Sequence, residues 1–295
     1  MGALVWRNVR SSILSGIPCL LLPAATACGA AAVASSRIED RARRDVPIAI
    51  CRKALTSTDT TEGGAPRLEA YWSVLFPEFR GFSSPLQSTA RDCVGDAPLT
   101  LGSGPGTALT LGPADSTITG GEGGIQAVWL RGSSSGSKST GALALVRPRP
   151  SELDVYAIGA YSGSTQHSKL ELALMDSAPV LLARDDSCAD AAAGTECEST
   201  LSVYLAAGGQ LRVAVRVPTE RFQVGALKDL GRVQWRLTTE APVFDANTMR
   251  LKEKLSLHDA RDNEVRKLEG QRAFVLRGRE LVTASETLWS RVGQF

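Results

Sequence analysis

The chain has 295 residues, of which 43% are hydrophobic and 22% are charged, so it is able to form a substantial globular core. The net charge is +2, but residues 1–53 carry eight Lys or Arg against three Asp or Glu, which leaves the remainder at −3. A globular part with this charge has no basic field for nucleic acid, so we expect no nucleic-acid partner.

An apolar segment, Ile13–Ala34, follows Arg7 and Arg10 and comes before the first acidic residue, Glu39. A basic start, an apolar centre and an exit rich in small residues are typical of a secretory signal. Because the basic flank stays inside, the sequence predicts that the rest of the chain lies outside the cytoplasm.

Within this segment, Ala25-Thr26-Ala27-Cys28 resembles the lipobox of bacterial lipoproteins, although Ala25 stands where that family usually has Leu. The resemblance implies a signal peptide over residues 1–27 and a membrane anchor through lipidated Cys28. Gly29 follows, in place of the Asp that often retains lipoproteins in the inner membrane. The resemblance therefore implies an outer-membrane lipoprotein of the cell envelope, facing the periplasm or the surface.

Two other fates of the segment stay open at this point. Ala32-Val33-Ala34 before Ser35 is an ordinary small-x-small cleavage site, which would give a freely secreted protein. The apolar run is also just long enough for an uncleaved anchor helix. Pro18 and Pro23 count against that helix, because each removes a backbone donor.

Six cysteines are present, and four of them, Cys51, Cys93, Cys188 and Cys197, lie beyond the export segment. An even number in an oxidising compartment favours disulfides, and four cysteines allow three pairings. Cys188 and Cys197 flank a short polar loop, so we pair them, and Cys51 with Cys93 by default. A zinc site is disfavoured because the sequence has no C-x-x-C spacing and only two histidines.

Residues 28–65 have little apolar pattern and predict a lipid-proximal tether whose end is fixed to the domain by Cys51. Residues 66–295 predict a single β-rich extracytoplasmic domain. One short helix is expected near 66–76, beginning at Pro66 and ending before Pro77. Its apolar residues fall on one helical face, as core packing requires.

Short half-buried strands are expected over residues 99–124, and a sustained β pattern follows them. The predicted strands, bounded by Gly, Pro, Ser or Asp, are Gln126–Arg131, Gly141–Arg147, Leu153–Tyr161, Lys169–Met175, Val180–Arg184, Thr200–Leu205, Leu211–Val217 and Val233–Thr239. Gly208-Gly209 indicates a tight hairpin, because both of its turn positions need positive φ. No helix-length segments separate these strands, so the pattern predicts an antiparallel meander or Greek-key sandwich, or a barrel-like sheet.

The tail over residues 249–270 is compatible with a helix or with strands. It lacks Gly and Pro through residue 269, which suits a helix, but Leu251, Leu255 and Leu257 alternate with polar residues, which suits a strand. We predict strands, with turns at 259–263 and at Arg277-Gly278.

The serine-rich segment 132–140 partly matches two catalytic motifs. As a phosphate-binding loop it has Ser137 where Gly is required, and a strand instead of a helix follows, so we expect no nucleotide. As a nucleophile elbow, G-x-S-x-G over 132–136 places Ser134 centrally, with His258 downstream as a base. An extracytoplasmic serine hydrolase using Ser134 and His258 is therefore an alternative function.

Carboxylates cluster around the second cysteine pair, at Asp185, Asp186, Asp190 and Glu196. Oxygen ligands on a constrained loop are what calcium prefers, so a calcium-stabilised adhesion-type domain is a second alternative. The alternating register of a calcium loop is absent, and we expect no metal.

These features favour a non-catalytic binding or structural module of the cell envelope over an enzyme. No nucleophile and base pair other than Ser134 and His258 suggests itself, and no cofactor is implied. The expected partners are the membrane, through the N-terminal lipid or anchor, and an envelope protein or glycan. Fold class alone assigns none of these partners.

Overall fold

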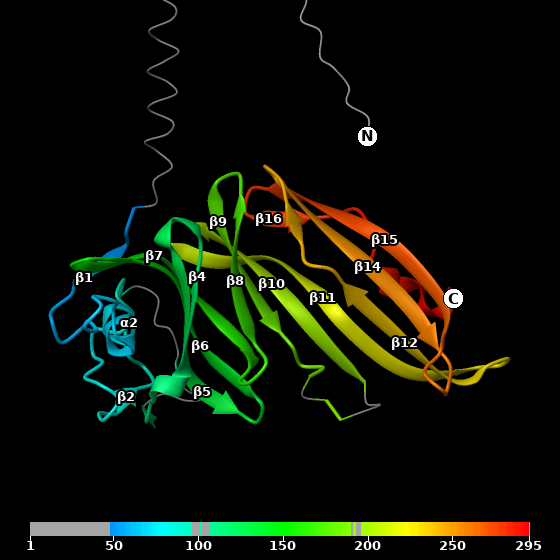
Figure 1. The fold of residues 1–295 in the computed structure, drawn as a ribbon, viewed down its shortest axis with the longest axis horizontal. Helices are drawn as coiled ribbons and strands as arrows, with labels where there is room; N and C mark the ends of the chain where they lie inside the picture. The colour runs from blue at the N-terminus through cyan, green and yellow to red at the C-terminus, as the bar shows by residue number, and fades with distance from the viewer. Residues whose placement is uncertain (1–47, 96–100, 102–106, 190, 193–195, 295) are drawn as a thin grey trace, which may run out of the picture. The chain divides into compact units, whose positions relative to one another are not determined.

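An extended β-sheet forms most of the described part of this computed structural model (Figure 1). The described residues are 48–95, 101, 107–189, 191–192 and 196–294. The predicted signal peptide, the lipobox-like residues and Cys28 lie outside this part of the chain. Within the described ranges, no helix is both long and apolar enough to cross a bilayer.

The predicted β architecture is confirmed, including each of the eight strands from Gln126 to Thr239. The strands are, in chain order, β1 (Cys51–Ala54), β2 (Leu86–Gln87), β3 (Ala108–Leu109), β4 (Ser116–Gly120), β5 (Gln126–Ser135), β6 (Lys138–Arg149), β7 (Glu152–Ser164), β8 (Lys169–Met175), β9 (Ala178–Asp185), β10 (Cys197–Ala207), β11 (Gln210–Leu227), β12 (Gly231–Thr239), β13 (Val243–Phe244), β14 (Thr248–His258), β15 (Glu264–Arg277) and β16 (Glu280–Val282). The short helix is α2 (Leu68–Leu75), and the 3₁₀ turns are η1 (Pro113–Asp115), η2 (Glu122–Gly124) and η3 (Leu288–Gln294).

The main sheet runs in the order β16-β15-β14-β12-β11-β7-β6-β5-β4, and β10, β9 and β8 branch from β11. Its described ladders are antiparallel except for one parallel pair, Gln210 with Ile158, which joins β11 to β7. The first part of β11 pairs with β10 and its last part with β12, so this single long strand belongs to both branches. The sheet is not closed into a barrel.

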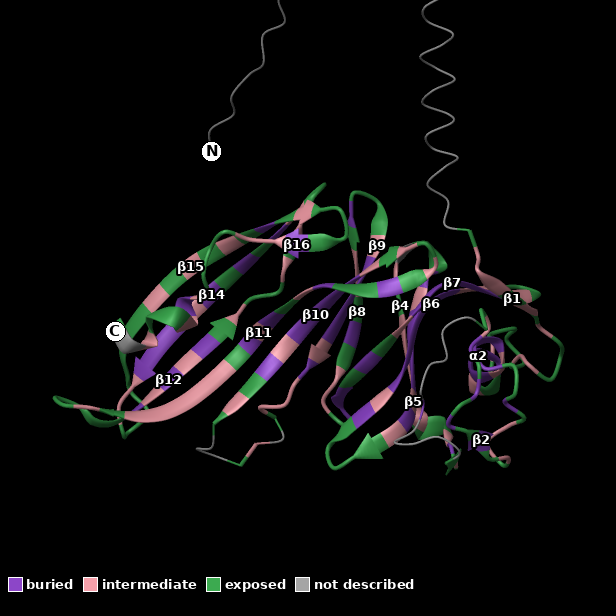
Figure 2. Ribbon diagram, turned by 180° about the vertical axis from the view of Figure 1, so that it is seen from behind, coloured by how far each residue is buried: buried purple, intermediate pink, exposed green. Residues whose placement is uncertain are grey.

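Strands β5, β6 and β7 are buried on both faces, which explains their nearly continuous apolar sequence. On β5, Val128 and Leu130 belong to one core, and Trp129 on the opposite face belongs to another. The first core lies against α2, and the second lies against β8, β9 and β10. The buried stretches of β5 and β6 are visible in Figure 2.

Strands β9 and β10 repeat this two-sided pattern one layer further on. Leu181 and Tyr204 face the same core as Trp129, whereas Leu182 and Val203 face a third core. This third core contains Met249 and other residues of β14, together with residues of β11, β15 and β16. Successive side chains of a strand point to opposite faces, so each of these strands contributes to the two cores on either side of it.

The helix α2 forms where the sequence predicted it and covers the outer face of β5–β7. Tyr71, Trp72 and Leu75 are buried, which confirms the core role of its apolar face. Trp72 Nε1 donates a hydrogen bond to Ser116 Oγ at 2.8 Å, and Tyr71 Oη donates one to Gln126 at 2.7 Å. Burial raises the pKa of Tyr71 despite the hydrogen bond to Gln126.

The predicted tether extends too far toward the domain. The folded unit begins at Ile48, and β1 pairs with β7 in an antiparallel ladder that aligns Arg52 with Asp154. With four residues, this strand is too short for its alternation of apolar and polar residues to distinguish it from a linker in the sequence. The disulfide Cys51–Cys93 is present as predicted, so the end of the expected tether is both paired and cross-linked.

Asp59 holds the turn after β1 in place. Lys53 Nζ lies 2.6 Å from Asp59 Oδ1 and 2.8 Å from Ser73 Oγ on α2. Burial alone would raise the pKa of Asp59, but the hydrogen bonds from Lys53 and from the Thr56 amide and hydroxyl outweigh it and lower the pKa to about 2.

The Asp59→Asn variant is expected to lose about 1–2 kcal/mol of stability at pH 7. The folded-state pKa lies below the ordinary value of 3.8, so ionised Asp59 stabilises the fold above about pH 4. That contribution disappears as the pH falls from about 4 to about 2, where wild type and variant should unfold alike. Urea unfolding at pH 7, 4 and 2 measures this, with Asp229→Asn at an exposed turn position as the control. A constant difference at all three pH values would contradict the assignment.

The tail forms strands and not a helix, as predicted. β14 and β15 pair through a turn at 259–263, where Asp259 Oδ1 accepts hydrogen bonds from the Arg261 and Asn263 amides. The side chain and amide of Asn263 lower the pKa of Asp259. The second predicted turn is also present, because Gly278 has φ 63° between β15 and β16.

Candidate binding groove

The segment around Ser134 is a β-hairpin, not a catalytic loop. β5 continues to Ser135, a tight turn with Gly136 at φ 60° follows, and β6 begins at Lys138. Ser134 lies in the ladder opposite Ser139 and is exposed. The expected loop is therefore two strand ends, and no helix starts here to present a nucleophile or to bind a phosphate.

His258 lies far from Ser134. Its Nε2 is 3.0 Å from Ser256 Oγ, and its Nδ1 is 3.2 Å from both the backbone oxygen and the carboxylate of Asp262. The strand order β14-β12-β11-β7-β6-β5 separates the two residues by five strand spacings, on the order of 20 Å along the sheet. The serine hydrolase hypothesis has no supporting geometry, and we do not propose it.

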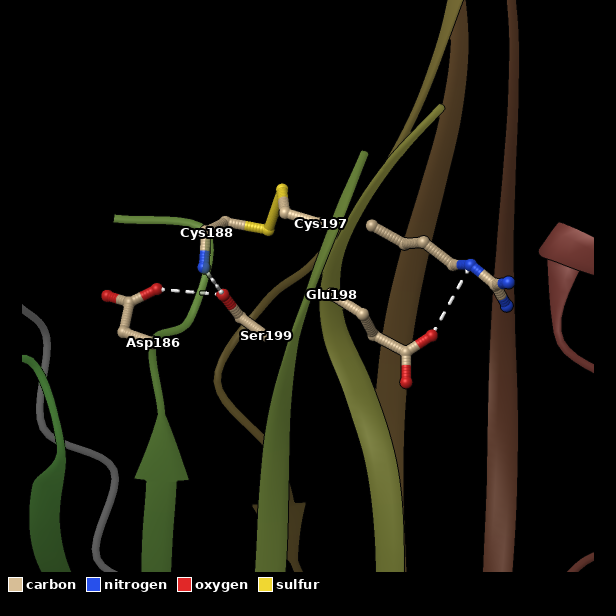
Figure 3. Close-up of a disulfide and its surroundings, with 6 residues drawn as sticks. Asp186, Cys188, Cys197, Glu198 and Ser199 are labelled. Atoms are coloured by element: carbon tan, nitrogen blue, oxygen red, sulfur yellow. Dashed lines mark hydrogen bonds and ion pairs between the residues drawn. A yellow bond between two sulfur atoms is a disulfide. The ribbon is translucent and has the colours of Figure 1, made fainter. Parts of the chain in front are cut away.

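The carboxylates of the acidic loop have separate local partners (Figure 3). Asp185 accepts a hydrogen bond from the Ser164 amide at 2.8 Å, and Asp186 accepts one from Ser199 Oγ at 3.0 Å. Glu196 lies immediately before β10, next to Cys197 of the disulfide, and Asp190 is outside the described residues. Among the described side chains, no three His, Cys, Asp or Glu gather to hold a metal ion.

The predicted Cys188–Cys197 disulfide is present and ties the end of β9 to the start of β10 (Figure 3). The Cys188 amide donates to Ser199 Oγ at 3.0 Å, which continues the bond from Ser199 to Asp186. Glu198 forms an ion pair with Arg221 at 3.3 Å on the neighbouring strand. These polar groups satisfy one another, as expected for a structural brace.

A different region, which the sequence did not single out, forms an open groove of about 460 Å³. We call it the Arg147 groove. Its wall is largely apolar, with one charged side chain. The lining residues are Gly123, Ile125, Arg147, Leu172, Ala173, Leu174, Ser177 and Pro179. The volume falls within the range of small-molecule sites in proteins.

The groove forms where the β8–β9 hairpin meets the turn before β5. β8 has no ladder partner in the described chain other than β9, so its free edge runs beside this turn. Gly121 allows the approach, because a Cβ there would come within 2.7 Å of Leu172 Cδ1. Leu174, further along β8, is 44% exposed and leaves the groove an apolar rim.

The hairpin turn that closes β8 and β9 is held in a left-handed conformation by residues other than glycine. Asp176 has φ 48° and Ser177 has φ 67°, as a two-residue turn of this hand requires. Neither residue is the Asn-Gly that such a turn prefers. A side chain with a Cβ is strained in this region by about 1 kcal/mol.

Replacing Ser177 by glycine is therefore expected to raise stability by about 0.5–1 kcal/mol. The matched control is Ala178→Gly, one residue on in β9 and outside the positive-φ positions, which should lower stability by a similar amount. Thermal unfolding of the two variants beside wild type measures both changes. Equal losses in the two variants would show that the turn carries no strain.

Arg147 belongs to a cluster of charged side chains on one face of β1, β6 and β7, in which three arginines face two carboxylates. Asp154 is fully buried, and its two oxygens accept hydrogen bonds from Arg52 Nε at 2.6 Å and Arg149 Nε at 2.7 Å. Glu152 lies 3.3 Å from Arg52 and 3.7 Å from Arg149. Burial would raise the pKa of Asp154, but the two arginines outweigh it and lower the pKa.

Arg147 is left without an acidic partner among the described side chains. Asp154 is its cross-strand neighbour, but Arg52 and Arg149 already occupy both carboxylate oxygens. Arg147 Nε is buried without a hydrogen bond in the described structure, and the guanidinium lies 5.6 Å from the centre of the Tyr156 ring. Three guanidinium groups facing two carboxylates leave one positive charge, which Arg147 carries into the groove.

No relative of known function helps to interpret this groove. No family model, no curated protein and no solved structure matches the chain.

Proposed function

We propose that this chain is an exported, lipid-anchored module of the bacterial cell envelope that binds a small molecule in the Arg147 groove and catalyses no reaction. The observation that carries the binding role is Arg147, a half-buried cation in a largely apolar groove whose Nε has no hydrogen bond to any described residue. An unpaired buried polar group costs free energy, and a ligand that pairs with it recovers that free energy.

Export is supported by the two disulfides, because such bonds form and persist in oxidising compartments. The lipobox-like segment supports anchoring through Cys28. An outer-membrane location, facing the periplasm or the surface, rests on Gly29 following that cysteine. An envelope protein or glycan partner remains part of the proposal without a surface assigned to it.

Intact mass spectrometry of the protein from a membrane fraction tests the anchor and the bonds together. We expect a chain that starts at Cys28, carries added acyl mass and gains four hydrogens on reduction of its two disulfides. A chain that starts at Ser35 without lipid would overturn anchoring and indicate a freely secreted protein. A mass that retains residues 1–27 would indicate an uncleaved anchor.

A further inference from the structure

We infer that the Arg147 groove binds a carboxylate that ends a single apolar chain, as in a fatty acid. This inference rests on the proposed binding function and names its ligand class. The groove supplies a cation at one point and an apolar wall elsewhere, from Ile125 on the turn before β5 to Leu172 and Leu174 on β8. A ligand that satisfies both must carry an anionic head and an apolar body.

The head group follows from the charge and shape of Arg147. The face beneath the groove has one unneutralised positive charge, and a carboxylate carries one negative charge. Nε and a terminal nitrogen of a guanidinium form a planar edge that matches the two oxygens of a carboxylate. A phosphate monoester carries nearly two negative charges at neutral pH and would leave an excess beside Asp154 and Glu152.

The body of the ligand follows from the groove wall. Leu172, Ala173 and Pro179 are half-buried and Leu174 is exposed, so an acyl chain lying along them would cover apolar surface now open to water. Each buried methylene contributes enough to strengthen binding about fourfold. Affinity should therefore rise steeply with chain length until the groove is filled.

Titration calorimetry on the full-length protein in nanodiscs of zwitterionic lipid tests this, with empty nanodiscs subtracted. The probes are hexanoate, octanoate and decanoate, with decanol, decylamine and decyl phosphate as head-group comparisons. We expect about fifteenfold tighter binding for each two added methylenes. Decanoate should bind at least tenfold more tightly than each of the three comparison compounds.

The Arg147→Met variant keeps the length and apolar stem of the side chain but removes the charge. It should weaken decanoate binding about 10- to 100-fold and leave decanol binding unchanged. Arg147→Lys keeps the charge without the planar edge and should give an intermediate loss. The matched control is Arg212→Met on β11, an exposed arginine outside the groove lining, which should bind like wild type.

A second variant keeps the proposal testable if Arg147→Met does not fold. Leu174→Ser changes an exposed residue of the rim, and it should reduce the gain from octanoate to decanoate without affecting hexanoate. Equal decanoate affinity of wild type and Arg147→Met would overturn the inference. Preference for decylamine or decyl phosphate would also overturn it, while the groove would stand as a binding site. The mass measurement above is independent of these titrations, so anchoring and ligand class can fail separately.

Discussion

Removal of the Cys51–Cys93 disulfide is expected to lower the free energy of unfolding by about 4 kcal/mol, the larger of the two disulfide effects. The bond closes a loop of 42 residues, and the loss of unfolded-chain entropy grows with loop length. Cys188 and Cys197 are only nine residues apart, so the same relation gives about 2.5–3 kcal/mol for their bond.

Removal of the Cys51–Cys93 disulfide should also change the folded state, which removal of the Cys188–Cys197 disulfide should not. The long loop contains α2, whose Trp72 and Leu75, together with the following Phe76, cover the outer face of β5–β7. Without the bond, β1 is held only by its short ladder to β7 and by the polar contacts of Arg52 and Lys53, so this cover can detach locally. The Cys51→Ala/Cys93→Ala variant should therefore bind a hydrophobic dye and unfold at lower urea concentration than wild type.

The double variant Cys188→Ala/Cys197→Ala is the matched control, because it removes one disulfide without changing a residue of the core between α2 and β5–β7. It should unfold between wild type and the first variant and should bind little dye. Denaturation under oxidising conditions measures all three proteins. A larger loss from the short loop than from the long one would contradict the entropy argument.

The Arg272→Met variant is expected to lose about 3–5 kcal/mol, because it leaves the buried Glu253 carboxylate without its cation. Arg272 Nη1 lies 2.9 Å from Glu253 Oε1, and the two side chains are 13% and 1% exposed. The other oxygen of Glu253 accepts hydrogen bonds from the Leu288 amide at 2.7 Å and from Thr287 Oγ1 at 3.2 Å. The pair thus connects β14 and β15 to the start of η3.

Loss of this ion pair should release η3 from the sheet. Leu288, Trp289 and Val292 of this segment pack over the apolar residues of β12 and β14. Urea unfolding measures the stability, and the near-ultraviolet circular dichroism that is lost in a Trp289→Phe background reports the local order. The control is Glu253→Leu/Arg272→Met, which removes both charges and should recover most of the loss. If the double variant is as unstable as Arg272→Met, the cost comes from lost packing and not from the unpaired charge.

The strands were predictable because their signals are local. Alternation of apolar residues identifies a strand wherever one face is buried, and Gly208 and Gly209 mark a turn because both need positive φ. The tail was resolved in favour of strands for the same reason, since Leu251, Leu255 and Leu257 are all buried on β14. Both disulfides also followed from the cysteines alone, because only three pairings were possible and one pair flanked a short loop.

Other features of the fold could not be predicted from the local sequence. The short strand β2 and the pairing of β1 with β7 depend on partners distant in the sequence. The serine-rich segment suggested a functional loop because it partly matches two catalytic motifs. It forms two strand ends, in which Ser134 is exposed and Ser139 opposite it is buried, and small polar residues fit both ladder positions.

By itself, the sequence determined the strands, the turns, the disulfides and the expectation of export, since each depends on residue type at short spacing. Only the tertiary structure decided that Arg147 has no acidic partner among the described side chains. The carboxylate opposite it, Asp154, is occupied by Arg52, which is 102 residues away in the chain, and by Arg149. Which arginine a buried carboxylate selects is set by geometry across three strands, and no spacing within one strand contains that information.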